Sequence, residues 1–425
     1  MLEEWRARRP EVPARKDNDA LWEGWASLEE QAVRWFGAHA RASGAFTAED
    51  REHLLDWIDA SPLGIDAVDA VAWGLDVATS PTFASAWREE LCANGDVRHE
   101  LAEGQPYPVA EAHWGLPATA AVSSRPSALS PPTIDELPHV RIHSDHGFRL
   151  VADFGLEADL RAVGAGLRVG AALHPNEHLT DFKFCRPSRH IVFPVRLRDP
   201  VEQQRHVLAL VEGVLRERAQ ICVLPELSTN PEIVEAIAAL VDEADDPHLV
   251  IAGSYHAGEG ETARNECVGL VPEGPQRLRH RKVVPFSDDL GLDPPWREGI
   301  AVDEPPELTI YHADRFRFCL LTCKDFLDGA VARALGRVAA NVICVPAMSA
   351  KTDAFVNRAA QHVAESQAVV LMANGPLRWE GGDPVEPAAV LGQPVRGGVP
   401  VEASMSPAPV AALFKFGTRA VDRVT

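Results

Sequence analysis

The chain has 425 residues, a formal net charge of −21 and 46% hydrophobic residues, a composition typical of a globular protein with a sizeable core. The acidic balance argues against non-specific binding to nucleic acid or to an anionic membrane, and no apolar run approaches the ~20 residues of a membrane span. Seven cysteines without a C-x-x-C pair indicate reduced thiols, so we expect a soluble cytoplasmic protein.

Residues 1–116 predict a mostly helical N-terminal region. In FTAEDREHLLDWIDASP, Thr47 is a suitable N-cap, apolar residues recur at helical spacing, and Ser61-Pro62 ends the run. Residues 64–79 and 81–93 predict two further helices. Most of the tryptophans of the chain lie in this region, and we expect them to fill a helical core, with an aromatic ligand cage as the alternative.

Residues 117–138 are rich in Pro, Ser and Ala and predict a linker, which a connecting segment over 139–187 follows. His139, His143 and His146 lie close together in this segment. Their spacing on an expected loop is a weak metal signal, so we interpret them as surface histidines and predict no metal site.

Strand-like and helical segments alternate from residue 188 to the end of the chain. The strand-like segments are HIVFPVRL, ICVLPEL, HLVIAGSYH, ECVGLVPEG, LRHRKVVPF, FRFCLLTC, NVICVPAM and VVLMANG. The helical ones are PVEQQRHVLALVEGVLRERAQ, PEIVEAIAALVDEA, GAVARALGRVA and VNRAAQHVAESQA. This alternation predicts an α/β domain over 188–425, whose chemistry gathers at the carboxyl ends of the strands.

Three residues with chemically useful side chains lie beside separate strand ends. Glu226 follows ICVLP, Lys282 precedes VVPF, and Cys323 is the expected last residue of FRFCLLTC. Each alone would be an ordinary surface or core residue, but together they suit acyl transfer: a thiol attacks, a carboxylate takes its proton, and an ammonium stabilises the oxyanion. The other strand cysteines are expected to be packing residues; they are Cys222, Cys267, Cys319 and Cys344.

The ordered motifs VLPELS, RNECVGLVPEGPQRLRHRKVVPF, LLTCKDF and AAQHVAESQAVVLMANG resemble the nitrilase, or carbon–nitrogen hydrolase, superfamily over about 188–425. The resemblance implies an α-β-β-α sandwich, here with the additional N-terminal helical region. It implies that Glu226 is the general base, Lys282 the catalytic lysine and Cys323 the nucleophile of a thioester mechanism without metal or organic cofactor. It further implies a homodimer or larger homo-oligomer, built on helices near the cysteine.

The sequence departs from the family pattern next to the cysteine. Many members have an aromatic residue there, whereas this chain has Lys324, which is either solvated or recognises an acidic substrate group or Asp325. Many members also have a second glutamate between the lysine and the cysteine. The candidates are Asp288, Asp289 and Glu298, with a slight preference for Glu298. Ser349, at the end of NVICVPAMS, is a further candidate substrate-binding residue.

The sequence thus predicts a cysteine-dependent hydrolase of a small non-peptide C–N bond, of amide or N-carbamoyl type. A nitrile substrate is less favoured, because Lys324-Asp325 replaces the tryptophan-glutamate pair of many nitrilases. Two alternatives stay open. One is an N-acyltransferase with the same three residues, and the other is a regulated effector or ligand sensor whose N-terminal region recruits a protein partner.

Overall fold

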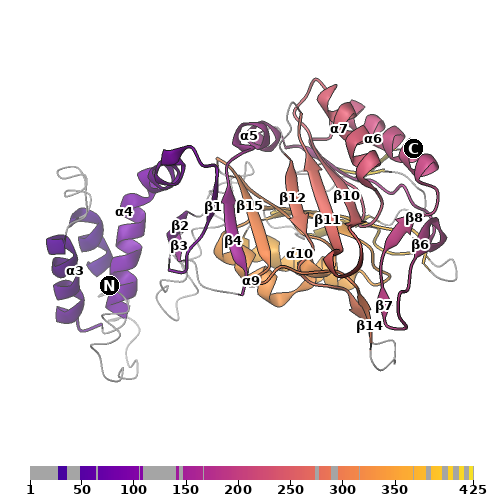
Figure 1. The fold of residues 1–425 in the computed structure, drawn as a ribbon. Helices are drawn as coiled ribbons and strands as arrows, with labels where there is room; N and C mark the ends of the chain where they lie inside the picture. The colour runs from indigo at the N-terminus through magenta and orange to yellow at the C-terminus, as the bar shows by residue number, and fades with distance from the viewer. Residues whose placement is uncertain are drawn as a thin grey trace. The chain divides into compact units, whose positions relative to one another are not determined.

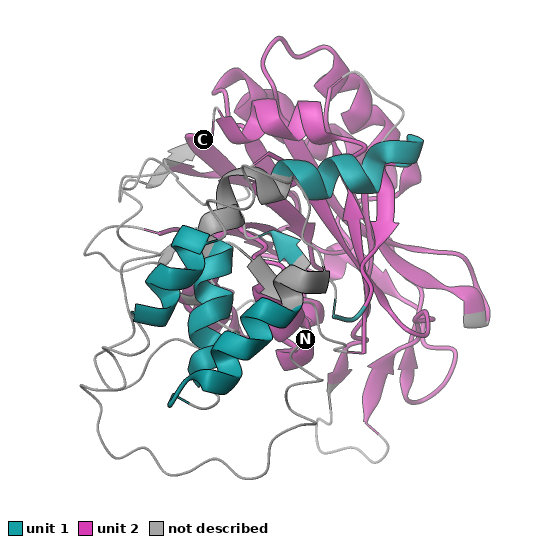
Figure 2. Ribbon diagram, turned by 90° about the vertical axis from the view of Figure 1, so that its left-hand side faces the viewer, with its two compact units in different colours: residues 1–96, 103–109, 117–143 teal, residues 97–102, 110–116, 144–425 magenta. Residues whose placement is uncertain are grey.

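A computed structural model describes most of the chain. The described ranges are 27–35, 48–63, 66–104, 106–108, 140–142, 147–165, 167–272, 277–288, 295–314, 316–366, 368–379, 384–394, 401–404, 411–415 and 421–424. The chain forms two compact units, shown in teal and magenta in Figure 2. The first comprises residues 1–96, 103–109 and 117–143, and the second comprises 97–102, 110–116 and 144–425.

The first unit is helical. Its described elements are helical residues 27–35, α3 (Ala48–Ala60), α4 (Asp66–Leu91), the 3₁₀ turn Cys92–Asn94, and the paired strands β2 (Pro106–Pro108) and β3 (Val140–Ile142). Helix α3 ends directly before Ser61-Pro62, as predicted, whereas α4 is one continuous helix where two were expected. Its core is small and apolar, with partly buried Trp35, Trp57 and Trp73 packed against Leu54 and Ile58.

The second unit is a sandwich of two mixed sheets. One sheet has eight described strands in the order β1 (Arg98–Glu100), β4 (Arg149–Asp153), β15 (Glu307–Ala313), β16 (Phe316–Leu320), β17 (Val342–Ala347), β18 (Val369–Asn374), β19 (Ala389–Gly392) and β20 (Val401–Ser404). The other has seven described strands in the order β12 (Leu278–Arg281), β11 (Arg264–Leu270), β10 (Leu249–Ala257), β9 (Ile221–Val223), β5 (Val169–Ala172), β21 (Ala411–Lys415) and β22 (Val421–Val424).

Smaller elements surround this sandwich. They are the sheet β13 (Ser287–Asp288), β14 (Trp296–Glu298) and β7 (Ile191–Val192), the pair β6 (Phe182–Phe184) and β8 (Val195–Leu197), and the 3₁₀ turns Leu179–Asp181 and Gly260–Thr262. The segment HIVFPVRL was expected to be one strand. It forms β7 and β8 instead, interrupted at Phe193-Pro194, because proline has no N–H to continue a strand ladder.

Helices cover the outer faces of the two sheets, except α5, which packs against the core between them (Figure 1). Their bounds are α5 (Glu157–Ala165), α6 (Pro200–Arg216), α7 (Pro231–Asp242), α8 (Lys324–Leu327), α9 (Gly329–Arg337) and α10 (Asp353–Ser366). Asp199 and Asn230 cap α6 and α7, each followed by proline at the first helical position, as the sequence pattern requires. The apolar faces of α6 and α7 pack on β9, β10 and β11, and α10 packs on β18 and β19. The predicted α-β-β-α architecture is therefore confirmed.

The core lies between the sheets, where apolar residues of β9, β10, β16, β17 and β18 meet. At its centre β16, β17 and β18 are parallel, and β9 is parallel to both β5 and β10. The sequence analysis predicts that the active-site residues lie at the carboxyl ends of such strands. No helix of the described ranges is long and apolar enough to span a bilayer.

The division into units differs from the boundaries drawn on the sequence. Residues 147–187, expected as part of a connecting segment, contribute β4 and β5 to the two large sheets. Strand β4 pairs with β15, and β5 pairs with β9, so the sandwich begins well before residue 188. The linker 117–138 and His139, His143 and His146 lie outside the described residues.

Candidate active site

Glu226 lies in a turn directly after β9, and several contacts hold this turn. Its N–H donates to Ala347 O at 3.3 Å, and Ser228 Oγ donates to Pro225 O at 2.7 Å. Gly253 of β10 has a φ of +65°, and a Cβ built there would lie 2.3 Å from Pro225 O. Only glycine fits this close approach, so β10 fixes the turn that presents the Glu226 carboxylate.

Cys323 lies between β16 and α8 in a strained backbone conformation. Its φ is +47° and its ψ −100°, a region that non-glycine residues seldom adopt. Its N–H donates to Pro346 O at 2.8 Å, and its Sγ lies 3.8 Å from Met348 O. The expectation that Cys323 ends the strand is wrong, because β16 ends at Leu320. The turn between β16 and α8 takes the chain out of the hydrogen-bonded sheet. The thiol therefore directly precedes the first turn of α8.

Lys282 lies between two buried carboxylates. Its Nζ is 2.8 Å from Glu226 Oε1 and 2.6 Å from Glu298 Oε2, and its side chain is only 1% exposed. The structure thus brings Glu298 to the lysine. Of the other two candidates for the acidic position, Asp289 lies outside the described residues, and the side chain of Asp288 is not among those described.

Two further side chains hold this pair of glutamates. Asn265 Nδ2 donates to Glu226 Oε1 at 2.8 Å and to Glu298 Oε1 at 2.9 Å. Val195 N–H donates to His256 Nδ1 at 3.0 Å, so that nitrogen carries no proton. The opposite nitrogen, Nε2, lies 2.8 Å from Glu298 Oε1 and is therefore the donor. Sequence analysis missed His256; the only signal was a polar residue near the end of an apolar strand.

The charges of the cluster set its protonation. Burial opposes the charge of Lys282, but Glu226 and Glu298 outweigh it and hold the pKa of the lysine well above its ordinary range. Burial would also raise the pKa of Glu298, but Lys282 and the hydrogen bond from His256 hold it well below its usual value. Lys282 is therefore an ammonium, and Glu298 is a permanent carboxylate beside it.

Glu226 has the opposite shift. Burial raises the pKa of Glu226 above its ordinary 4.5; the Lys282 charge opposes this shift, and the Glu298 charge adds to it. The Glu226 carboxyl and the Cys323 thiol shift each other's pKa, so the two groups interact electrostatically. Burial, and then the Glu226 charge, raise the pKa of the Cys323 thiol, so the resting nucleophile is a protonated thiol beside a base.

Asp325 is fully buried and contacts groups of the protein itself. His280 Nε2 lies 2.7 Å from its Oδ2, and the N–H groups of Val283 and Val284 donate to its Oδ1 at 3.1 and 2.7 Å. These contacts tie the turn after Cys323 to the segment that carries Lys282. Asp325 thereby positions the nucleophile and the lysine relative to one another.

Lys324 and Ser349 are chain neighbours of groups at the thiol: Lys324 follows Cys323, and Ser349 follows Met348. The Lys324 side chain is half-buried, and within the described part of the chain neither its ammonium nor its backbone N–H has a partner. Ser349 exchanges hydrogen bonds with Asn374: Ser349 N–H donates to Asn374 Oδ1, and Asn374 Nδ2 donates to Ser349 O, both at 2.9 Å. This pair fixes the loop that holds Met348 O beside the thiol.

The strand cysteines Cys222, Cys267, Cys319 and Cys344 are buried, as expected of packing residues. Burial raises the thiol pKa of each of them, so none is an ionised nucleophile. Among the described residues, no cluster of histidine, cysteine and acidic side chains could hold a metal ion.

No family model and no curated protein matches the chain. Among solved structures, it is similar to an amidase from Nesterenkonia sp. with 14% identity and a TM-score of 0.40, over 59% of this chain and 90% of that one. A mutant of the Nesterenkonia AN1 amidase from the nitrilase superfamily matches with 15% identity and a TM-score of 0.41, over 59% and 91%. Saccharomyces cerevisiae Nit3, a member of branch 10 of that superfamily, matches with 12% identity and a TM-score of 0.42, over 59% and 90%. At these values, we base the functional interpretation on the geometry of the site.

Proposed function

We propose that this chain is a cysteine-dependent hydrolase of small non-peptide C–N bonds, of the nitrilase-superfamily type. One observation carries the proposal: Lys282 holds the buried carboxylate of Glu226 on one side and that of Glu298 on the other, and the charge of Glu226 acts on the Cys323 thiol. Acyl transfer needs a nucleophile, a base and a cation that lie next to one another in space.

In the first step the Cys323 sulfur bonds to the carbonyl carbon, and its proton passes to Glu226. The carbonyl electron pair moves onto oxygen, where the Lys282 ammonium and the free N–H of Lys324 stabilise the negative charge. Collapse of this intermediate breaks the C–N bond, and the departing nitrogen takes the proton from Glu226. A thioester and an amine or ammonia result.

In the second step water attacks the thioester carbon and gives a proton to Glu226. The C–S bond then breaks, and the sulfur of Cys323 recovers the proton from Glu226. A raised pKa suits both steps, because a base of higher pKa accepts the thiol proton more readily and a carboxyl group of moderate pKa returns it.

The substrate class that fits this chemistry is a carboxamide or an N-carbamoyl compound. Its leaving nitrogen needs one proton, and Glu226 holds one at that stage. If an amine replaced water in the second step, the same residues would perform N-acyl transfer. Product analysis in the presence of primary amines separates the two reactions: the free acid supports hydrolysis, and a new amide supports acyl transfer.

The test is intact-mass analysis of the purified chain after exposure to a panel of amides, ureas and nitriles. We expect an acyl adduct on Cys323 and, with a good substrate, release of ammonia. Cys323→Ala should abolish both, whereas Cys185→Ser, at an exposed cysteine outside the site, should change neither. An adduct on Cys319 or Cys344, or full turnover by Cys323→Ala, would contradict the proposal.

A ligand-sensing or effector role is the second candidate, because the first unit has a hydrophobic core of its own. In this case the hydrolase-like unit would bind a ligand and the helical unit a protein partner. A cellular effect that survives Cys323→Ala would support the sensor. An effect that disappears together with ammonia release would support the enzyme. The predicted homodimer stays a prediction that size-exclusion chromatography with light scattering would test.

A further inference from the structure

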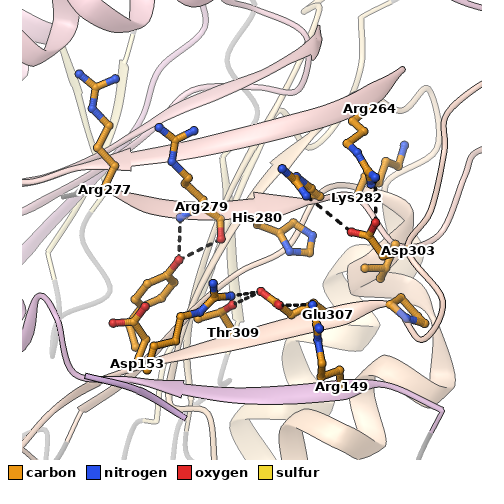
Figure 3. Close-up of a pocket in the computed structure, with 15 residues that line it drawn as sticks. Arg149, Asp153, Arg264, Arg277, Arg279, His280, Lys282, Asp303, Glu307 and Thr309 are labelled. Carbon is orange, nitrogen blue, oxygen red and sulfur yellow. Dashed lines mark hydrogen bonds and ion pairs between the residues drawn. The ribbon is translucent and has the colours of Figure 1, made fainter. Parts of the chain in front are cut away.

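A cavity lies in the sandwich unit. It encloses about 320 Å³ and is lined by β12 and the start of β11 from one sheet, and by β1, β4 and β15 from the other (Figure 3). This volume is at the lower end of the range for small-ligand pockets. Lys282 and His280 are among its lining residues, whereas Cys323 and Glu226 are not, and the Lys282 ammonium is engaged by the glutamates of the candidate active site. A ligand in this cavity would therefore not be the one that the thiol attacks.

The lining is strongly cationic in a chain whose net charge is −21. Six arginines contribute to it: Arg98, Arg149, Arg264, Arg277, Arg279 and Arg281. Only three carboxylates do so, namely Asp153, Asp303 and Glu307. An excess of cation on one concave surface of an acidic protein raises the local concentration of anions.

The internal ion pairs cancel only part of this excess of positive charge. Glu307 pairs with both Arg98 and Arg149. Asp303 pairs with Arg264 at 2.8 Å and lies 3.7 Å from Arg281, as Figure 3 shows for Arg264 and Asp303. Arg281 also lies 3.5 Å from Glu266, so two positive charges meet one negative charge at Glu307, whereas Arg264 and Arg281 are matched by Asp303 and Glu266.

The remaining two arginines differ from one another. Arg277 forms a two-pronged pair with Glu235, at 2.6 and 2.7 Å, and is thereby compensated. The guanidinium of Arg279 forms no hydrogen bond or ion pair in the described part of the chain, and its charge acts on Glu235 and Tyr255 from a distance. The backbone of Arg279 is fixed. Arg279 N–H donates to Tyr311 Oη at 2.7 Å, and Tyr311 Oη donates to Arg279 O at 2.9 Å. An unpaired guanidinium on a fixed strand is a preorganised anion donor.

We propose that this cavity binds a small doubly charged oxyanion, such as a phosphate group or a dicarboxylate, with Arg279 as its main ligand. A planar guanidinium group suits bidentate bonding to such oxygens. Strand β12 then connects the anion to the candidate active site. His280 on β12 contacts Asp325, and Lys282 follows the strand directly.

The test is isothermal titration calorimetry of the full chain at low ionic strength, with inorganic phosphate and malonate in separate arms and sodium chloride at equal ionic strength as reference. We expect phosphate or malonate to bind. The anion with the lower Kd shows whether the cavity prefers a phosphate group or a dicarboxylate. Arg279→Glu should weaken the Kd by roughly tenfold or more, the loss expected for one charge-assisted hydrogen bond. Arg279→Gln is the second variant, and thermal melting without ligand checks that both are folded.

The matched control is Arg216→Glu, which makes the same charge change at an exposed arginine of α6 outside the cavity. It should keep the wild-type Kd. Three results would overturn the proposal: no binding of either anion beyond the chloride reference, an unchanged Kd in folded Arg279→Glu and Arg279→Gln, or an equal loss in Arg216→Glu.

Discussion

Lys282 and Arg279 lie three residues apart in the sequence, at one edge of one sheet, yet their surroundings have opposite charge balances. Around Lys282, two buried carboxylates share one cation. In the cavity beside Arg279, two partly exposed arginines share the single carboxylate of Glu307. Burial makes the first cluster a proton-handling site with shifted pKa values, whereas partial exposure leaves the second with free positive charge for an external anion.

The largest effect should come from removing the cation of the buried cluster. Lys282→Met leaves Glu226 and Glu298 buried without their cation, so we expect loss of detectable turnover and about 3–5 kcal/mol less stability. Arg277→Met breaks an ion pair whose carboxylate is largely exposed and should cost at most about 1 kcal/mol. Urea unfolding of both variants measures the difference; equal costs would mean that burial does not separate these ion pairs.

Variants of His256 test how far the buried cluster depends on the hydrogen bond that orients Glu298. His256→Phe removes the donor to Glu298, and we expect kcat to fall by roughly tenfold to a hundredfold, the worth of one hydrogen bond to a charged group. His256→Gln keeps a donor and should recover part of this loss. If the two variants are equally active and equally stable, the hydrogen bond has no role in catalysis.

The pH dependence tests the raised pKa of the base. Glu226 must be ionised to take the thiol proton, so activity falls as pH drops through its pKa in the folded protein. Because burial raises that pKa, the acidic limb of kcat/KM should have its midpoint above 4.5. Glu298, with its lowered pKa, stays ionised over this range. A profile that is flat down to pH 4.5 would contradict the assignment of Glu226 as base.

Lys324 should give the smallest effect, and one confined to substrate preference. Its backbone N–H remains in Lys324→Ala, so kcat for a neutral amide should change little. If its unpaired ammonium recognises an acidic group, KM for an acidic amide should rise by several-fold relative to that for a neutral one. An equal change for both substrates would indicate that the side chain is only solvated.

Much of the fold was predictable because its signals are local. The amphipathic pattern of α6 and α7, with Asp199-Pro200 and Asn230-Pro231 at their starts, placed both helices closely. Neither β4 nor β15 was predicted as a strand, and their pairing joins residues 149–153 and 307–311, which align only through the sheet. The two helices expected over 64–93 form one helix, because the local sequence specifies only weakly where a helix ends.

The residue types and their order along the chain were enough to select Glu226, Lys282 and Cys323, although β9, β12 and β16 each end before these residues. Their chemical types were enough to propose acyl transfer. Only the tertiary structure decided that Glu298 rather than another acid meets Lys282, that His256 orients it, and that Asp325 joins His280. These contacts join residues on different strands and loops. Their meeting depends on strand register and on the packing of one sheet against the other, neither of which a local pattern contains.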